Sequence, residues 1–177
     1  YNHTIRKVSS DGAVSTLAGL AGSPGYANGM VGGARFDNPF GVAADLSANV
    51  YVADSYNCTI RKVTSTGVVT TLAGSPGQPG STDGSGSEAR FSYPSGIAVD
   101  KLGNLYVADH DNSTVRKITG AGVVTTLAGQ AGQPGEADAG HGQPQPQVVI
   151  LRPAEILVAA RAYDQISFAD NTRMNKR

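Results

Sequence analysis

The sequence predicts an all-β protein built from β-propeller blades of four antiparallel strands each. The first reason is an internal repeat of 55 residues. Residues 1–55 match 56–110 at 30 positions without a gap, and residues 56–84 match 111–139 at 18 of 29 positions. A fixed period of this length indicates stacked copies of one supersecondary unit. The second reason is composition, since 23 glycines and 9 prolines beside 40% hydrophobic residues are typical of a turn-rich but folded chain.

Each copy contains four short runs of β-branched and aromatic residues separated by Gly, Asn or Asp, as expected for strands and turns. The predicted strands of one copy are 41–45, 50–54, 59–63 and 68–72. Those of the next copy are 94–100, 105–109, 114–118 and 123–128. Residues 4–8 and 14–18 match the third and fourth strands of an earlier blade. Four antiparallel strands per repeat describe one blade of a propeller.

The repeat weakens after residue 139, and this divides the chain into three predicted parts. Residues 1–139 are propeller blades, residues 140–152 are a linker rich in Pro and Gln, and residues 153–177 are a degenerate partial blade. In that last part, residues 153–158 and 166–170 match the first two strands of a blade. A short helix over residues 154–163 is the alternative, because Ala, Glu, Leu and Arg dominate there.

Two complete blades and two half-blades amount to about three blades, whereas closed propellers have about four to eight. We therefore expect half of a six-bladed ring, closed by self-association with a second copy or by further sequence of a longer protein. An open arc would expose apolar sheet faces at its ends, including Val42, Ile97 and Leu105.

The run from Pro94 to Asp109, followed by an Asn and an Arg-Lys pair, resembles the NHL-repeat β-propellers. The residues that carry the resemblance are Pro94, Gly96, Asp100, Gly103, Asn104, Tyr106, Asp109, Asn112 and Arg116. The preceding copy carries it at Pro39, Gly41, Asp45, Asn49, Tyr51, Asp54, Asn57 and Arg61. That copy has Ala48 where the family prefers glycine, which leaves the turn type open. The spacing is similar to a subgroup common in secreted and cell-surface proteins, so the resemblance implies an extracellular or cell-surface location.

NHL propellers include protein-binding and RNA-binding modules and a few lyases and hydrolases, and the fold alone does not choose among them. We expect a non-enzymatic binding or scaffold module that recognises a protein or glycan through the loops of one face, because no His/Asp/Glu cluster recurs. The alternative is a hydrolase or lyase with its site at the central channel. The aspartates Asp45, Asp54, Asp100 and Asp109 are interpreted as turn and strand-end residues that accept backbone hydrogen bonds.

The candidate ligand-binding loops are two long Gly/Pro-rich connections, residues 20–38 and 75–93, which lead from the fourth strand of one blade to the first strand of the next. Loops on a rigid scaffold commonly carry binding sites. The candidate residues in them are Arg35, Phe36, Arg90, Phe91 and Asp83. Packing between blades is the alternative role for these loops. The recurring pairs Arg6/Lys7, Arg61/Lys62 and Arg116/Lys117 form either a basic arc or solvated strand positions that deter edge pairing.

Charge and motif spacing argue against several classes of partner. The 14 basic and 14 acidic residues give no net charge, which disfavours nonspecific nucleic-acid binding, and no apolar run is long enough to span a bilayer. Residues 83–88 carry too few carboxylates for a calcium loop, and His3, His110 and His141 lack metal-ligand spacing. We therefore expect no metal and no cofactor.

Two further expectations concern one turn of each blade, between its second and third strands. The sequons Asn2-His3-Thr4, Asn57-Cys58-Thr59 and Asn112-Ser113-Thr114 lie there in register. If the turn is exposed, Asn2, Asn57 and Asn112 are candidates for N-glycosylation; the alternative is that asparagine serves the turn conformation. Cys58 is predicted to be a partly exposed free thiol, because the other copies carry the polar residues His3 and Ser113 at the same position.

Overall fold

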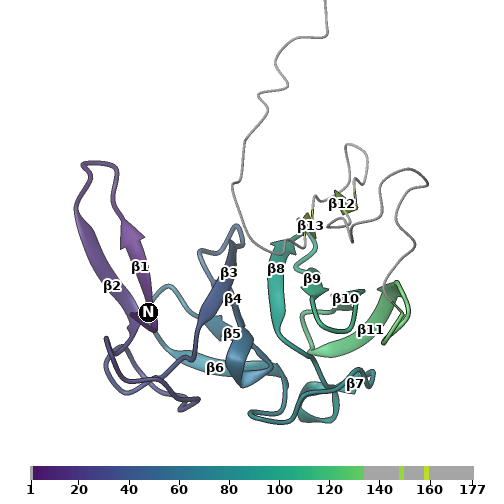
Figure 1. The fold of residues 1–177 in the computed structure, drawn as a ribbon. Coiled ribbons are helices and arrows are strands. Elements are labelled where there is room, and N and C mark those ends of the chain that lie inside the picture. The colour runs from purple at the N-terminus through teal and green to yellow at the C-terminus, as the bar shows by residue number, and fades with distance from the viewer. Residues whose placement is uncertain (1, 134–147, 150–157, 160–177) are drawn as a thin grey trace, which may run out of the picture.

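The computed structural model describes residues 2–133, 148–149 and 158–159, and these form an arc of consecutive β-sheets (Figure 1). The second sheet has the order β3-β4-β5-β6 and the third has the order β7-β11-β10-β9-β8. The strands of the second sheet are β3 (Pro39–Ala44), β4 (Val50–Asp54), β5 (Thr59–Val63) and β6 (Val69–Gly74). Those of the third are β7 (Gly84–Ser85), β8 (Pro94–Val99), β9 (Leu105–Asp109), β10 (Thr114–Ile118) and β11 (Val123–Ala128). The prediction of four-stranded antiparallel blades is confirmed.

The first sheet has two strands, β1 (Thr4–Val8) and β2 (Val14–Gly19), as predicted for a half-blade. Two short 3₁₀ turns, η1 (Ser55–Asn57) and η2 (Gly86–Glu88), accompany the strands. Strands β12 (Val148–Val149) and β13 (Val158–Ala159) pair antiparallel with each other. The rest of the predicted linker 140–152 and partial blade 153–177 lies outside the described residues, so both stay predictions.

The apolar core lies between the sheets, because strand side chains alternate between two faces. Val52 of β4 packs toward the first sheet, while Tyr51 and Ala53 pack toward the third. One aromatic ring from a long connection fills each junction: Phe36 between the first and second sheets, and Phe91 between the second and third. Both rings are fully buried, and burial of such a ring contributes about 1.5–3 kcal/mol.

The innermost strands of neighbouring sheets approach each other closely. A Cβ on Gly41 of β3 would lie 2.1 Å from the carbonyl oxygen of Ser95 in β8, so glycine is required for this contact. On the opposite side of β3, Phe40 and Val42 are 68% and 58% exposed. Val42 therefore agrees with the expectation of exposed end faces.

That expectation is wrong for the third sheet, at Ile97 and Leu105. Leu105 is fully buried in the core between the second and third sheets, and Ile97 packs against that core. The reason is that their side of the third sheet faces the second sheet, which covers it.

The long connections also protect the outer edge of each blade. In the third sheet the connection contributes β7, which pairs with the outermost strand β11 through Ser85 opposite Val123. In the second sheet the equivalent contact is a bridge between Gly29 and Val69 of β6. A strand edge that is already paired is not open to another chain, so these bridges block edge-to-edge aggregation.

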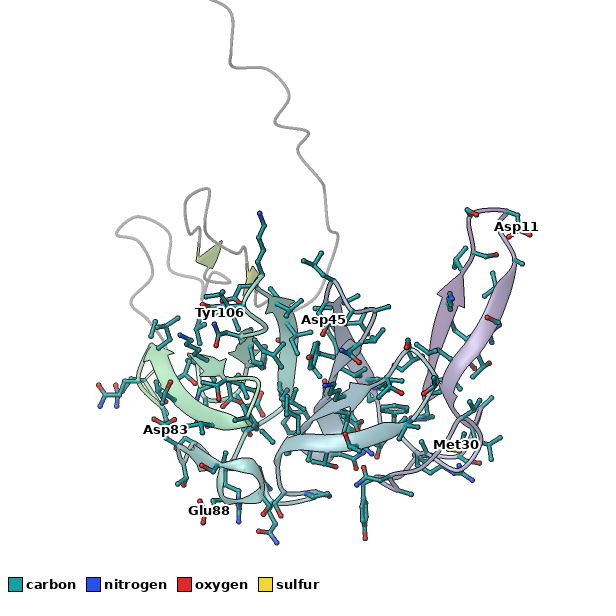
Figure 2. The ribbon with its side chains drawn as sticks, turned by 180° about the vertical axis from the view of Figure 1, so that it is seen from behind. Asp11, Met30, Asp45, Asp83, Glu88 and Tyr106 are labelled. Atoms are coloured by element: carbon teal, nitrogen blue, oxygen red, sulfur yellow. The ribbon has the colours of Figure 1, made fainter. Side chains whose placement is uncertain are left out.

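Antiparallel pairing divides the loops between two faces of the arc. The loop face carries the long connections 20–38 and 75–93 and the turns between second and third strands. The turn face carries the tight turns between first and second strands and between third and fourth strands. Figure 2 shows Met30, Asp83 and Glu88 on the loop face, with Asp11 and Asp45 on the opposite side.

Candidate functional site

A buried arginine ties each long connection to the blade beneath it. In the second sheet, Arg61 Nη1 lies 2.8 Å from Asp54 Oδ2, and both side chains are fully buried. The same guanidinium donates to the carbonyl oxygens of Ala27 and Arg35 at 3.1 and 3.0 Å, and to Asn28 Oδ1 at 2.8 Å. This network holds connection 20–38 rigidly against β5.

The third sheet repeats the network around Arg116. Its Nη1 lies 2.8 Å from Asp109 Oδ2, and its Nη2 lies 2.7 Å from Asp83 Oδ1. Each buried guanidinium also stands over the phenylalanine of its junction, with Arg61 5.2 Å from the ring centre of Phe36. Both predicted roles of the arginines, a basic arc and solvated positions, are therefore wrong for Arg61 and Arg116. Their charge is enclosed by carboxylates and carbonyl oxygens.

Burial raises the pKa of the Asp54 carboxyl above its usual value. Hydrogen bonds from Asn57, from the backbone N–H of Asp37 and from Arg61 act in the opposite direction. Asp109 has the same arrangement, and its pKa is raised for the same reason. Both aspartates accept a backbone hydrogen bond, at 2.7 Å in each case, as predicted for strand-end residues.

The turn between second and third strands is more enclosed than the glycosylation hypothesis requires. Asn57 is 6% exposed. Its Nδ2 donates to Gly25 O at 2.7 Å and to Asp54 Oδ2 at 2.8 Å, which uses both amide hydrogens. Asn112 makes the equivalent pair of bonds and is half-buried, whereas Asn2 is exposed. The expectation that this turn is exposed is therefore wrong at Asn57, and asparagine there has a structural role.

The predicted exposure of Cys58 is also wrong, because the thiol is free but only 3% exposed. The backbone N–H of Tyr93, at the entrance to the next blade, donates to its sulfur. At the preceding junction the N–H of Asn38 donates to His3 Nδ1 at 3.1 Å in the same manner. Ser113, the third copy, is exposed. Burial raises the pKa of the Cys58 thiol, which disfavours the reactive thiolate.

The five residues predicted to bind ligand divide into two groups. Phe36 and Phe91 are fully buried plugs between sheets, which is the packing role considered as the alternative. Arg35 and Arg90 bind carbonyl oxygens of their own connections, Gly32 and Ala34 for the first and Ser87 and Ala89 for the second. Asp83 joins Arg116 to Thr126. These contacts show how the three polar residues shape the loop face; their role toward a ligand stays a prediction.

Two tyrosines form an exposed aromatic pair that the sequence analysis did not identify. The rings of Tyr56 and Tyr93 lie 5.4 Å apart at 78° in an edge-to-face arrangement, and they are 53% and 44% exposed. Tyr56 belongs to the 3₁₀ turn η1 of the second blade, while Tyr93 enters the first strand of the third. The residues equivalent to Tyr56 are Tyr1 and Asp111, and the residue equivalent to Tyr93 in the preceding copy is Asn38. Tyr56 therefore recurs in one other copy, whereas Tyr93 does not recur in the preceding one.

The backbone holds this aromatic pair in place. The N–H of Tyr56 donates to Asp37 O at 3.1 Å, and a hydrogen bond from the backbone of Tyr93 to Cys58 lowers the pKa of that thiol against the effect of burial. Tyr93 also has φ of 48°, in the left-handed region that bulky residues rarely adopt. Asn38, at the same position of the preceding copy, has φ of 51°, so this backbone conformation belongs to the repeat. The signal available in the sequence was Tyr93, which stands where the preceding copy has Asn38, close to a turn that carries tyrosine in two copies.

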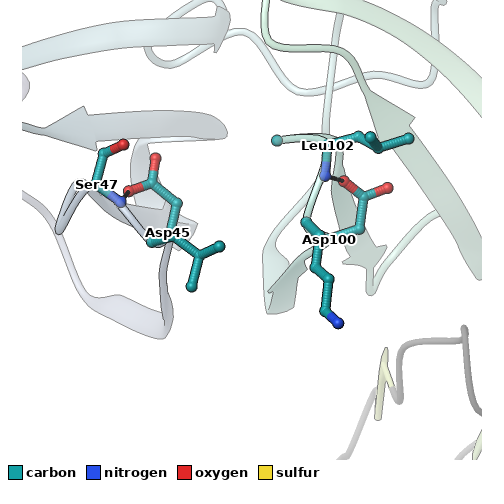
Figure 3. A pocket seen from close by; sticks show the side chains of 7 residues that line it. Asp45, Ser47, Asp100 and Leu102 are labelled. Carbon is teal, nitrogen blue, oxygen red and sulfur yellow. Dashed lines mark hydrogen bonds between the residues drawn. The ribbon is translucent and has the colours of Figure 1, made fainter.

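The opposite, turn face has a shallow hollow of about 230 Å³ between the first turns of the second and third blades (Figure 3). Its two carboxylates are engaged within their own turns. Asp45 Oδ1 accepts the N–H groups of Ser47 and Asn49, and Asp100 repeats this with Leu102 and Asn104. The predicted turn role of these aspartates is confirmed. Leu46 and Leu102 beside them are 91% and 88% exposed.

Within the residues that the structure describes, no three His, Cys, Asp or Glu side chains are grouped so that they could hold a metal ion. In the same part of the chain, no helix has the length and hydropathy needed to cross a membrane.

Comparison with known proteins finds similarity to one repeat family. The family model for the NHL repeat matches residues 91–118. NHL repeat-containing protein 2 of Homo sapiens is 38% identical over 123 residues, which are 64% of this chain and 17% of that protein. The chain thus spans less than a fifth of the length of this relative.

Two solved structures share the architecture. A structural genomics protein of unknown function from Bacteroides thetaiotaomicron is 29% identical with a TM-score of 0.61, over 66% of this chain and 30% of that one. An auxiliary nutrient binding protein from Bacteroides ovatus is 28% identical with a TM-score of 0.53, over 72% of this chain and 33% of that one.

Proposed function

Because the repeats of this chain belong to the NHL-repeat family, we propose that it acts as a non-enzymatic binding or scaffold module that recognises a protein or glycan through its loop face. The observation that carries the proposal is the exposed Tyr56–Tyr93 pair at the junction of two blades. Tyrosine supplies a large, rigid contact surface with few rotatable bonds and is enriched at binding interfaces.

The surroundings of the pair are preorganised for binding. Buried arginines fix both long connections, and hydrogen bonds hold the backbone of both tyrosines, so little backbone entropy is lost when a ligand binds. The similar structure from Bacteroides ovatus is that of an auxiliary nutrient binding protein, which supports a binding role for this architecture. Fold-level likeness does not define a ligand, so the proposal depends on the tyrosine pair.

The test is a screen of the intact chain on peptide and glycan arrays, repeated with a Tyr56→Ala/Tyr93→Ala variant. We expect the variant to lose at least tenfold in affinity for the ligands that the screen identifies, because hot-spot residues are enriched in aromatic anchors. The control is Leu46→Ala/Leu102→Ala, which removes two exposed apolar side chains from the turn face. Loss of binding in the control but not in the tyrosine variant would contradict the proposal. Chemical turnover of a bound ligand would contradict the non-enzymatic part.

We also propose that the exposed side of β3 receives the inner strands of another NHL blade, as needed to close a ring. Phe40 and Val42 are exposed, whereas the residues at the same positions of the next blade, Ser95 and Ile97, are buried or packed beneath β3 and β4. In the third blade this position lies on β8, and the inner strands β3 and β4 of the second blade cover it. The inner strands of a further blade would cover the same position on β3. A second copy of the chain is the occupant available to the isolated chain. Native mass spectrometry is expected to show self-association that Phe40→Asp/Val42→Asp abolishes; a stable 18.1 kDa monomer would contradict this.

A further inference from the structure

The tyrosine pair lies between two acidic residues along the loop face. Asp37 O accepts the N–H of Tyr56 at 3.1 Å, which places Asp37 directly beside that ring's backbone. On the other side, the N–H of Asp111 donates to the carbonyl oxygen of Ser92, the residue before Tyr93, also at 3.1 Å. The side chains of Asp37 and Asp111 are 31% and 43% exposed. The order around the arc is therefore acidic, aromatic, aromatic, acidic.

The nearby arginines do not neutralise this surface. Arg35 and Arg90 direct their guanidinium groups to carbonyl oxygens of the connections. Arg61 and Arg116 are fully buried and paired with Asp54 and Asp109. The two exposed carboxylates have histidine neighbours, His3 Nδ1 at 3.4 Å from Asp37 and His110 Nδ1 at 2.7 Å from Asp111.

We propose that the Tyr56–Tyr93 pair and its flanking carboxylates bind a lysine or arginine side chain of a partner protein. This inference rests on the proposed function and specifies its ligand. An aromatic ring carries negative charge on its face and attracts a cation within about 6 Å of its centre. The molecule uses this contact elsewhere, since Lys62 Nζ lies 5.9 Å from the ring centre of Tyr51 and Arg116 lies 5.1 Å from that of Phe91.

Hydrogen-bonding capacity favours a basic side chain over a sugar. An ionised carboxylate only accepts hydrogen bonds, while the lysine ammonium and the arginine guanidinium only donate them. A sugar hydroxyl both donates and accepts, so a sugar site commonly also needs donor groups. The tyrosine hydroxyls and the neighbouring imidazoles can donate hydrogen bonds, but the carboxylates on the two sides of the rings, Asp37 and Asp111, only accept them. Charge complementarity therefore selects a basic peptide segment as the occupant.

The test uses fluorescent peptides of Gly and Ser that contain two arginines, with a control peptide in which uncharged citrulline replaces both arginines. Binding is measured by fluorescence anisotropy at about 0.05 and 0.5 M NaCl. The higher salt concentration shortens the distance over which charges attract each other severalfold. For the intact chain we expect at least tenfold tighter binding of the arginine peptide and weaker binding at high salt. Asp37→Asn/Asp111→Asn should lose at least fivefold in affinity for the arginine peptide. Asp11→Asn, which removes a carboxylate on the turn face, should match the unsubstituted chain.

The outcomes separate this inference from the proposed function. If Tyr56→Ala/Tyr93→Ala loses array ligands while Asp37→Asn/Asp111→Asn and salt have no effect, the face binds ligands without charge recognition, and this inference is wrong. Salt-insensitive binding of a neutral glycan at the tyrosine pair would overturn it in the same way. If the tyrosine variant retains every array ligand, the proposed function itself fails. Thermal unfolding of each variant confirms that a loss of binding is not a loss of fold.

Discussion

The guanidinium group of Arg61 lies 2.8 Å from the carboxylate of Asp54, and neither side chain is accessible to solvent. The two residues are seven positions apart on adjacent antiparallel strands, and Asp109 and Arg116 repeat the pair one blade later at the same 2.8 Å. Because each arginine also binds carbonyl oxygens of a long connection, the pair joins the blade to the loop face. The rigidity of the candidate site therefore originates in the blade interior.

Replacing Arg61 with methionine is expected to destabilise the chain strongly. The substitution leaves the Asp54 carboxylate buried without its cation, and breaking a buried pair in this way costs about 3–5 kcal/mol. Urea denaturation would measure the loss. The matched control is Arg6→Met, because Arg6 occupies the same repeat position but is exposed; its effect should stay within about 0.5 kcal/mol. If the two substitutions lowered the free energy of unfolding equally, burial of the Arg61–Asp54 pair would not be the cause of the destabilisation.

Strand positions were predictable because they depend on local sequence. Runs of β-branched residues between Gly, Asn and Asp place strands β4, β5, β9, β10 and β11 at their predicted bounds. The burial of Arg61 was not predictable from polarity, since a charged residue on a strand is usually solvated. The available signal was the recurring spacing of seven between Asp54 and Arg61 and between Asp109 and Arg116.

The tyrosine pair and Cys58 show a different limit. Both depend on how one blade sits on the next, which a repeat alignment does not contain. Polar replacements at His3 and Ser113 indicated exposure, yet Cys58 is covered because Tyr93 enters the next blade directly beside it. Ser113 is exposed because no sheet beyond the third one covers it within the described residues. The same turn thus has different exposure in different blades.

The turn at Ala48 is expected to be stabilised by glycine. Ala48 has φ of 59°, and its N–H donates to Asp45 O at 3.0 Å, as the N–H of Gly103 does to Asp100 O. The family departure at this position therefore leaves the turn geometry intact, but a residue with a Cβ is strained there by roughly 1–2 kcal/mol. Ala48→Gly should recover most of that energy in urea denaturation. Gly103→Ala, where an added Cβ meets nothing within 4 Å, should lose a similar amount. Destabilisation by Ala48→Gly, or stabilisation by Gly103→Ala, would refute the strain account.

Acid is expected to weaken the turn at Asp100. Partial burial acts to raise the pKa of Asp100, but hydrogen bonds from Asn104, Leu102 and Tyr106 outweigh it and hold the pKa below its usual value. The unfolded chain therefore binds this proton first as the pH falls. The stabilisation is fully present above the unfolded pKa, about 3.9, and is lost as the pH falls through the folded pKa.

Asp100→Asn isolates this contribution because it keeps the shape of the side chain and removes its charge. At pH 7 the variant should be less stable than the unsubstituted chain by at most about 1 kcal/mol, since the carboxylate is only partly buried and solvent screens it. The difference should shrink as the pH is lowered below about 4. Urea denaturation at a series of pH values would measure it, and a difference independent of pH would contradict the assignment.

The Cys58 thiol is expected to react slowly in the native state. Burial limits the access of reagents to the sulfur, and the raised pKa lowers the fraction of thiolate, which is the nucleophile. Labelling by a maleimide should follow unfolding, with a rate that rises steeply in urea. A Cys58→Ser/Ser113→Cys variant moves the thiol to the equivalent, exposed position of the third blade and should label at least tenfold faster without denaturant. Similar native rates for both chains would show that the junction opens readily.

Asn57 is expected to be structural, and unglycosylated in folded material. Its amide hydrogens reach Gly25 O and Asp54 Oδ2, and a glycan on Nδ2 would replace one of these bonds and force open a buried turn. Asn57→Ala should destabilise the chain by about 1–3 kcal/mol, because Asp54 loses a buried donor. Asn2→Ala changes an exposed sequon and should stay within about 0.5 kcal/mol. Peptide mapping of folded chain from a eukaryotic secretory host would then find bare Asn57, and a glycan there together with native stability would overturn the structural role.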